Sequence, residues 1–231
     1  MIRHLDSSQP DFDNALTTLL RFSEEDQSDV TETVRQIIRD VRLRGDRSVL
    51  ELTNRFDGRS VENMTELTVD KNRLENAFNN LAPLTADALR VSADRIRVYH
   101  EKQLKAGGAS WDFEDDLGNR LGQRVRAMSR VGLYAPGGKA TYPSTVLMTA
   151  IPAHVAGVEE LVLCVPMPNG EANEVLLAAA WLSEVDLVLS IGGAQAVAAM
   201  AYGTDSVPKV NKIVGPGNIF VATAKEMVFG D

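Results

Sequence analysis

Three glycine-rich segments in the second half of the chain combine residue types that can bind a phosphate-bearing ligand. They are YAPGGKATYPS (134–144), LSIGGAQAVAAM (189–200) and KIVGPGNIFVATA (212–224). Each lies between an apolar run and a helical stretch of small residues, an order typical of strand, tight turn and helix. Glycine lets the backbone come close to a ligand, and the helix start that follows presents unpaired N–H groups and partial positive charge. We therefore expect one crevice that binds a phosphate-bearing cofactor.

Three polar side chains stand beside these turns, and they are Tyr134, Gln195 and Asn218. A tyrosine offers a flat face and a hydroxyl, and the amides of glutamine and asparagine both donate and accept hydrogen bonds. The three therefore suit a base, ribose hydroxyls or phosphate. The alternative is structural, with Asn218 capping the helix that follows and Tyr134 packing half-buried. The residue types alone leave both alternatives open.

The third turn departs from the glycine fingerprint of dinucleotide-binding folds. Gly215 and Gly217 have the spacing of its first two glycines, but Phe220 stands where a third glycine or an alanine belongs. No acidic residue follows at the distance at which ribose is usually bound. Because glycine also makes tight turns that bind nothing, the three turns together favour a binding site more than any one of them does.

Cysteine and histidine give little support for other chemistry. Cys164 lies inside the apolar run LVLCVP, and we expect a buried, inert thiol because a nucleophilic thiol needs exposure and a positive setting. An aldehyde dehydrogenase-like enzyme that uses this cysteine is the least favoured alternative. His4, His100 and His154 are far apart and lack metal-ligand spacing, so the sequence predicts no metal site within this chain.

The overall composition is that of an ordinary globular protein with an acidic balance. The chain has 231 residues, 44% of them hydrophobic, and a net charge of -8. Such a charge argues against a partner that is a nucleic acid or an anionic membrane, because both repel it. One cysteine forms no internal disulfide, and the polar N-terminus does not resemble a signal peptide. These features predict a cytoplasmic protein that binds neither nucleic acid nor membrane.

The charge is unevenly distributed, which predicts two regions of different architecture. Residues 1–128 contain 19 Lys and Arg and 23 Asp and Glu, whereas residues 129–231 contain 5 and 9. Charged amphipathic segments are typical of helices with one solvated face, and apolar runs are typical of strands covered on both faces. We expect a mainly helical N-terminal region over 1–128, with a short strand and a β-hairpin, and a Rossmann-like nucleotide-binding domain over 129–231.

The elements of the N-terminal region follow from caps and hydrophobic spacing. The prediction comprises a helix from the cap Asp29 to Gly45, a short helix ending at Asp57, a strand over 66–70, a helix capped by Asp70, a longer helix capped by Thr85 and ending at Gly107, and a hairpin from Trp111 to about Val125.

The second region alternates strands and helices, which predicts right-handed βαβ units and a parallel sheet. The strands are expected at 130–135, 160–166, 186–192 and 212–215, and the helices at 144–157, 174–184, 194–203 and 218–228. Ligands bind such sheets outside the carboxyl ends of the strands, where all three glycine turns fall. The fold class is therefore α/β, with an incomplete, aldehyde dehydrogenase-like Rossmann domain.

Five segments of this sequence resemble histidinol dehydrogenases, in order and at that family's spacing. They are VGLYAPGG, YPSTVLM, PAHVAGVEELVLCVP, GGAQAVAAMAYGT and SVPKVNKIVGPGN. The helical front is co-linear with the family's N-terminal helices. The resemblance implies NAD-dependent oxidation of L-histidinol through an aldehyde to L-histidine, a bound zinc and a homodimer. It also implies that Tyr134, Gln195 and Asn218 bind NAD.

The resemblance assigns the rest of the chemistry to residues outside this sequence. The chain stops at Asp231, before the family's zinc-binding Gln and His ligands and its Glu-His proton-transfer pair. Oxidation of an alcohol needs a base and an orienting electrophile. We therefore expect no catalytic residue and no zinc ligand here, and no turnover of substrate by the 231 residues alone. The alternative function is a non-catalytic nucleotide-binding or regulatory module.

Overall fold

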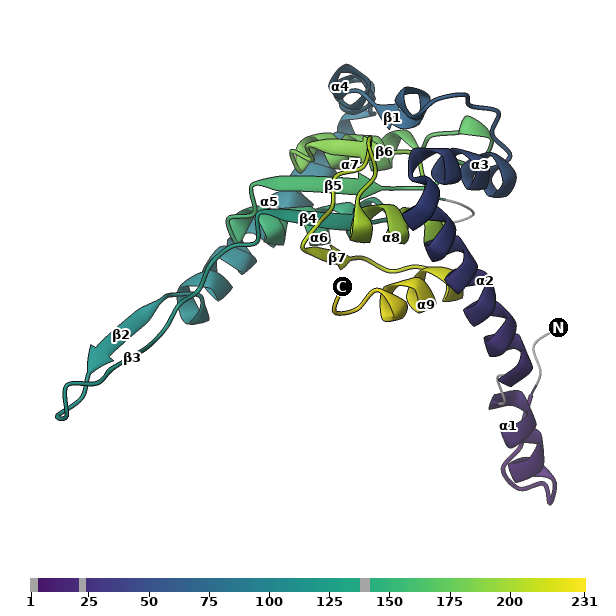
Figure 1. Ribbon diagram of the computed structural model, residues 1–231, viewed down its shortest axis with the longest axis horizontal. Helices are drawn as coiled ribbons and strands as arrows, with labels where there is room; N and C mark the ends of the chain where they lie inside the picture. The colour runs from purple at the N-terminus through teal and green to yellow at the C-terminus, as the bar shows by residue number, and fades with distance from the viewer. Residues whose placement is uncertain (1–3, 21–23, 138–141) are drawn as a thin grey trace.

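The apolar runs of the second region pair side by side into a sheet with helices on both faces (Figure 1). The structure is a computed structural model that describes residues 4–20, 24–137 and 142–231. The sheet has five strands in the order β1-β6-β5-β4-β7. Their bounds are β1 Thr68–Val69, β4 Arg130–Tyr134, β5 Glu160–Cys164, β6 Leu187–Leu189 and β7 Lys212–Val214. The predicted α/β class is confirmed.

Helices cover both faces because alternate strand residues point to opposite sides. Leu133 packs in the cluster formed with α4 (Lys71–Asn79), α5 (Pro83–Gly107), α6 (Pro143–Val155) and α7 (Glu174–Leu182). The next residue, Tyr134, packs in the other cluster, with α2 (Glu24–Arg44), α3 (Asp46–Asp57), α8 (Gly193–Tyr202) and α9 (Ile219–Met227). The result is a sheet between two helical layers.

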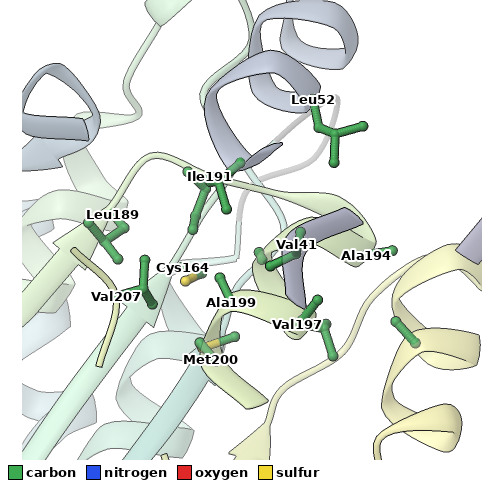
Figure 2. Packing of buried hydrophobic residues seen from close by; sticks show 14 of the residues in the cluster. Val41, Leu52, Cys164, Leu189, Ile191, Ala194, Val197, Ala199, Met200 and Val207 are labelled. Atoms are coloured by element: carbon green, nitrogen blue, oxygen red, sulfur yellow. The ribbon is translucent and has the colours of Figure 1, made fainter. Parts of the chain in front are cut away.

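Helix α8 lies at the centre of one of these layers. All its residues from Ala194 to Ala201 are buried, and α2, α3 and α9 pack against the helix. Figure 2 shows Val197 and Met200 of α8 among side chains from α2 and the strands. A helix made largely of alanine allows this close packing, because its small side chains let neighbouring backbones approach. The start of α8 is thereby held in a fixed position.

The N-terminal region differs from its predicted elements at four points, and the first is a helix, α1 (Phe12–Leu20), that the sequence did not predict. Helix α2 begins at Glu24 rather than at Asp29, because a helix can extend beyond the apolar residues whose spacing predicts it. Helix α5 begins at Pro83, which fits the first helical position, and not after a Thr85 cap. The strand predicted over 66–70 is a 3-10 helix, η1 (Met64–Leu67), followed by the two-residue β1.

Strand β1 adds an antiparallel edge strand to the predicted parallel sheet. It pairs antiparallel with β6, with Thr68 opposite Leu189, whereas the other pairings are parallel. The region before residue 128 thus contributes to the main sheet as well as to both helical layers. The division of the chain into domains at residue 128 stays a prediction.

Two parts of the chain extend away from the layered body (Figure 1). One contains α1 (Phe12–Leu20), and the other is the predicted hairpin, formed by β2 (Trp111–Glu114) and β3 (Arg120–Gln123). All residues of both hairpin strands are exposed. A last short 3-10 helix, η2, spans Pro168–Gly170. In the described ranges, none of the helices has the length and apolar character needed to cross a membrane.

Candidate functional site

The glycine turns meet at one cavity, at the carboxyl ends of the parallel strands. It has a volume of about 640 Å³, within the range of about 300–1,000 Å³ that is usual for ligand pockets. Tyr134, Gln195 and Asn218 all line it, although 84 residues separate the first from the last. The structure therefore brings together the three side chains that the sequence singled out. Residues 138–141 of the first turn lie outside the described residues.

Several loops and helix ends contribute to the wall of this cavity. Its lining residues are Thr33 and Ile37 of α2, Phe56 and Asp57 of α3, Tyr134, Pro136, Gly137 and Tyr142 around the first turn, Pro166 and Pro168 after β5, Gly193, Ala194 and Gln195 of α8, and Gly217, Asn218 and Phe220 at α9. The prolines and aromatic rings provide flat apolar surfaces, and the helix starts provide polar groups.

Tyr134 ends β4 and joins the sheet to the start of α8. Its hydroxyl accepts a hydrogen bond of 3.1 Å from the backbone N–H of Gly193, and no other side chain of the described residues caps this helix. The residue is only 4% exposed, and burial raises the pKa of its phenol to about 12. Tyr134 therefore stays neutral, fixes the helix start and can donate its hydroxyl proton into the cavity.

Gln195 has an amide oxygen without a hydrogen-bond partner among the described residues. The residue is 1% exposed, and its Oε1 is a buried acceptor with no hydrogen bond from the described residues. An unpaired buried polar atom costs on the order of 1–3 kcal/mol. Since Gln195 belongs to the wall of the cavity, a ligand donor is the natural partner for this oxygen.

Asn218 is the N-cap of α9. Its Oδ1 accepts a hydrogen bond of 3.1 Å from the N–H of Val221, so the capping role expected as the structural alternative is present. The same side chain is exposed and lines the cavity, and its amide nitrogen has no partner within the described ranges. Capping and ligand binding are compatible, because they use opposite ends of one amide.

Glycine permits the loops beside the cavity to pack closely on one another. A Cβ at Gly137 would lie 2.0 Å from the carbonyl oxygen of Pro166, and a Cβ at Gly192 would lie 2.5 Å from the Cβ of the same proline. Any larger residue at either position would push apart the loops that follow β4, β5 and β6. The glycines are therefore required to bring these loops together around the cavity.

Helices α2 and α3 contribute wall residues that the sequence did not indicate. Ile37 and Thr33 come from α2, and Phe56 and Asp57 come from the end of α3. The sequence marks Asp57 only as the end of a helix. The missing information is the packing of α2 and α3 beside α8, which joins residues more than 130 positions apart in the sequence. No local motif marks such a contact.

The described residues offer neither a reactive cysteine nor a cluster of metal ligands. Cys164 is fully buried on β5, and burial raises the pKa of its thiol far above the ordinary value, so the thiolate that a nucleophile requires is disfavoured. Across the described residues, no cluster of three or more His, Cys, Asp and Glu side chains could hold a metal ion. The described residues thus do not fit a zinc ion.

The fold and the cavity place this chain among the α/β proteins whose ligands bind at the carboxyl edge of a parallel sheet. Comparison with known proteins then identifies the family. The family profile described as "Histidinol dehydrogenase" matches residues 20–231. The chain belongs to the histidinol dehydrogenase family.

Over the part that matches, bacterial relatives are identical to this chain at about half of the positions. Histidinol dehydrogenase of Pseudomonas syringae pv. tomato is 54% identical over 229 residues, which is 99% of this chain and 50% of that protein. The Pseudomonas aeruginosa enzyme is also 54% identical, over 99% of this chain and 51% of its own length. The chain therefore spans about half the length of the curated relatives that it matches.

A solved structure matches the fold. The crystal structure of histidinol dehydrogenase from Elizabethkingia anophelis superposes with a TM-score of 0.79 at 26% identity. The match covers 90% of this chain and 49% of that one. The resemblance stated from the sequence motifs is confirmed at the level of the family and the fold.

Proposed function

We propose that this chain is the NAD-binding part of an enzyme that oxidises L-histidinol to L-histidine. The observation that supports the proposal most directly is the meeting of Tyr134, Gln195 and Asn218 at one cavity in a chain of the histidinol dehydrogenase family. When bound, NAD supplies the acceptor for the hydride that leaves the alcohol. The residues of the cavity wall bind and orient the nucleotide.

The wall of the cavity suits a dinucleotide in three respects. The starts of α8 and α9 both face the cavity, and helix N-termini favour the negative charge of a pyrophosphate. Gln195 Oε1 and the amide nitrogen of Asn218 offer an acceptor and a donor to sugar hydroxyls or to a base. Phe220 and Pro136 offer apolar faces against which a ring can pack. Binding energy and orientation are the roles assigned to these groups.

A titration of NAD tests the proposal. Wild-type chain and the variants Tyr134→Ala, Gln195→Ala and Asn218→Ala are titrated by calorimetry, with Gln103→Ala on the exposed face of α5 as a matched control. Each lost hydrogen bond is expected to cost on the order of 1 kcal/mol, which is several-fold in affinity. The control should bind as the wild type does. Equal affinity in all five proteins would remove the assignment of the three residues.

The alternative, a nucleotide-binding or regulatory module without chemistry, predicts the same titration. The two functions differ in a second measurement, the formation of NADH from L-histidinol by the longest natural form of the protein. Turnover supports the dehydrogenase, and tight NAD binding without turnover in that form supports the module. Cytoplasmic localisation remains a prediction for either.

A homodimer is proposed as the functional assembly, as the family resemblance implies. The hairpin supports it, since Trp111 and Phe113 stack at 6.2 Å between ring centroids while remaining 54% and 52% exposed. Exposed aromatic pairs of this kind are typical of surfaces that bury themselves in a partner. Sedimentation of wild type against Trp111→Ser with Phe113→Ser tests this. A wild-type monomer at micromolar concentration would contradict it.

A further inference from the structure

Asp57 occupies an unfavourable place for a carboxylate. It is the last residue of α3, and Gly58 ends the helix in the left-handed conformation, with φ 61° and ψ 32°. The carboxyl end of a helix carries partial negative charge, so a negative side chain at this position is repelled by the helix itself. A cation at this position would instead be stabilised. The location therefore needs an explanation other than helix stability.

The carboxylate of Asp57 is also poorly compensated by the protein. Its Oδ2 is buried and accepts no hydrogen bond from the residues that the structure describes. Burial raises the pKa of this carboxyl above its ordinary value, and the charge of Arg59 offsets that effect only in part. Arg59 is directed elsewhere, towards the carbonyl oxygen of Met167 at 3.4 Å and the hydroxyl of Ser190 at 3.5 Å.

Asp57 lines the same cavity as the proposed NAD-binding residues. Tyr134 lines this cavity as well, and the charge of Asp57 is one of the influences on the pKa of its phenol, after burial, the Gly193 hydrogen bond and Cys164. Two acceptor oxygens without donors among the described residues, Asp57 Oδ2 and Gln195 Oε1, thus belong to one cavity wall.

The sequence around the glycine turns lacks the acidic residue that binds ribose in dinucleotide folds. In those folds an Asp or Glu accepts a hydrogen bond from the ribose 2′-hydroxyl and excludes a 2′-phosphate. The tertiary structure supplies an acidic side chain to the cavity from α3, which ends 77 residues before Tyr134. The acid is present, but it comes from another part of the chain.

We propose that Asp57 accepts a hydrogen bond from the ribose of the adenosine half of NAD and makes the cavity select NAD over NADP. This inference rests on the proposed function, since it assigns one more residue to the same NAD site. A diol donates to the carboxylate and relieves its unpaired state. A 2′-phosphate brings a second negative charge against the first, and it offers the carboxylate no hydroxyl donor at that position.

The test compares NAD and NADP as titrants of the 231-residue chain. The variants are Asp57→Asn and Asp57→Ala, the positive reference is Gln195→Ala, and Glu75→Gln on the exposed face of α4 controls for the loss of one negative charge. Far-UV circular dichroism and urea unfolding establish that each variant is folded. The dissociation constants for both nucleotides are measured at fixed salt concentration, since charge effects are screened.

Loss of a hydrogen bond to a charged group predicts that Asp57→Asn and Asp57→Ala weaken NAD binding roughly ten-fold or more. The affinity for NADP should be unchanged or higher, so that the preference for NAD over NADP falls by at least roughly ten-fold. Glu75→Gln should leave both constants unchanged. Asp57→Asn should also be more stable than wild type in urea, which a residue that merely supports the fold would not be.

Three results overturn the inference. If both Asp57 variants bind NAD like the wild type while Gln195→Ala binds weakly, the assignment of the NAD site is supported and the role of Asp57 is refuted. If the Asp57 variants lose NAD and NADP affinity in the same proportion, the residue does not select between them. If the wild type binds neither nucleotide while folded, the proposed function fails and the inference fails with it.

Discussion

Replacing Gly215 by alanine tests whether the turn after β7 requires glycine. Gly215 has φ +119°, outside the regions open to residues with a side chain, and a Cβ there would lie 1.9 Å from the carbonyl oxygen of Tyr134. Contacts below 3.0 Å are essentially never made by a Cβ. Because the obstacle is backbone of the adjacent strand β4, a rotamer change does not relieve it. The turn or the strand has to move.

The loss of folding free energy expected for Gly215→Ala follows from two effects, the unfavourable φ and the close Cβ contact. A backbone held in a sparsely populated region costs about 1–3 kcal/mol, and overpacking a close contact costs about 1–3 kcal/mol more. The sum, about 2–6 kcal/mol, is a large fraction of the usual folding free energy of about 5–15 kcal/mol. Since Gly217 and Asn218 follow Gly215 within three residues, the movement also displaces the start of α9, and NAD affinity should fall with stability.

Substitutions at two other glycines distinguish the backbone effect from the steric effect when all variants are unfolded in urea. Gly118 in the hairpin turn has φ +81°, but a Cβ there would meet only Glu114 Oε1, at 3.9 Å, so Gly118→Ala isolates the backbone effect at about 1–2 kcal/mol. Gly107 at the end of α5 has open space and no positive φ, so Gly107→Ala should be neutral or stabilising by up to about 1 kcal/mol. If Gly215→Ala destabilises no more than Gly118→Ala, the close approach to Tyr134 is not a constraint.

Three more predictions concern the site. Tyr134→Phe leaves the N–H of Gly193 without its acceptor and should lower the free energy of unfolding by about 1–3 kcal/mol, and an unchanged urea midpoint would contradict this. Because burial raises the pKa of Asp57 in the folded chain, the ionised carboxylate lowers the free energy of unfolding at pH values above that raised pKa. This loss of stability decreases as the pH falls through the raised pKa, and it is absent below the ordinary value of 3.8. Asp57→Asn should therefore stabilise the chain at neutral pH and lose this advantage in acid, as urea midpoints across pH would show. The 231 residues by themselves should form no NADH from L-histidinol, since they span about half the length of the curated relatives and the described residues contain no cluster that could hold a metal ion, and measurable turnover would refute this.

Local sequence determined most of the secondary structure. The alternation of apolar runs and glycine turns predicted each strand and α-helix from Arg130 to Met227, although not the short 3-10 helix η2, because burial on both faces leaves a direct pattern in the sequence. Asp70 caps α4 as predicted, with its carboxylate accepting the N–H of Arg73 at 2.8 Å. A cap depends on neighbours within a few residues, so the sequence can indicate it, although the predicted caps Asp29 and Thr85 lie inside α2 and α5.

The site was predictable in part for the same reason. Tyr134, Gln195 and Asn218 each adjoin a glycine turn, and parallel strands bring such turns to one edge of the sheet. The hydrogen bond from Gly193 to Tyr134, 59 residues apart, was not predictable, because it depends on the register of β4 with its neighbours. The sequence also could not predict that Gln195 Oε1 has no hydrogen-bond partner among the described residues, because this state results from burial within a packed layer.

Local residue patterns were thus enough to indicate the family, the α/β class and the three polar residues beside the glycine turns. The antiparallel pairing of β1 with β6, and the place of Asp57 in the cavity wall, came only from the packing of the folded chain. Both depend on contacts between segments more than 70 residues apart, where the energy of packing selects the partner and no short motif records the choice.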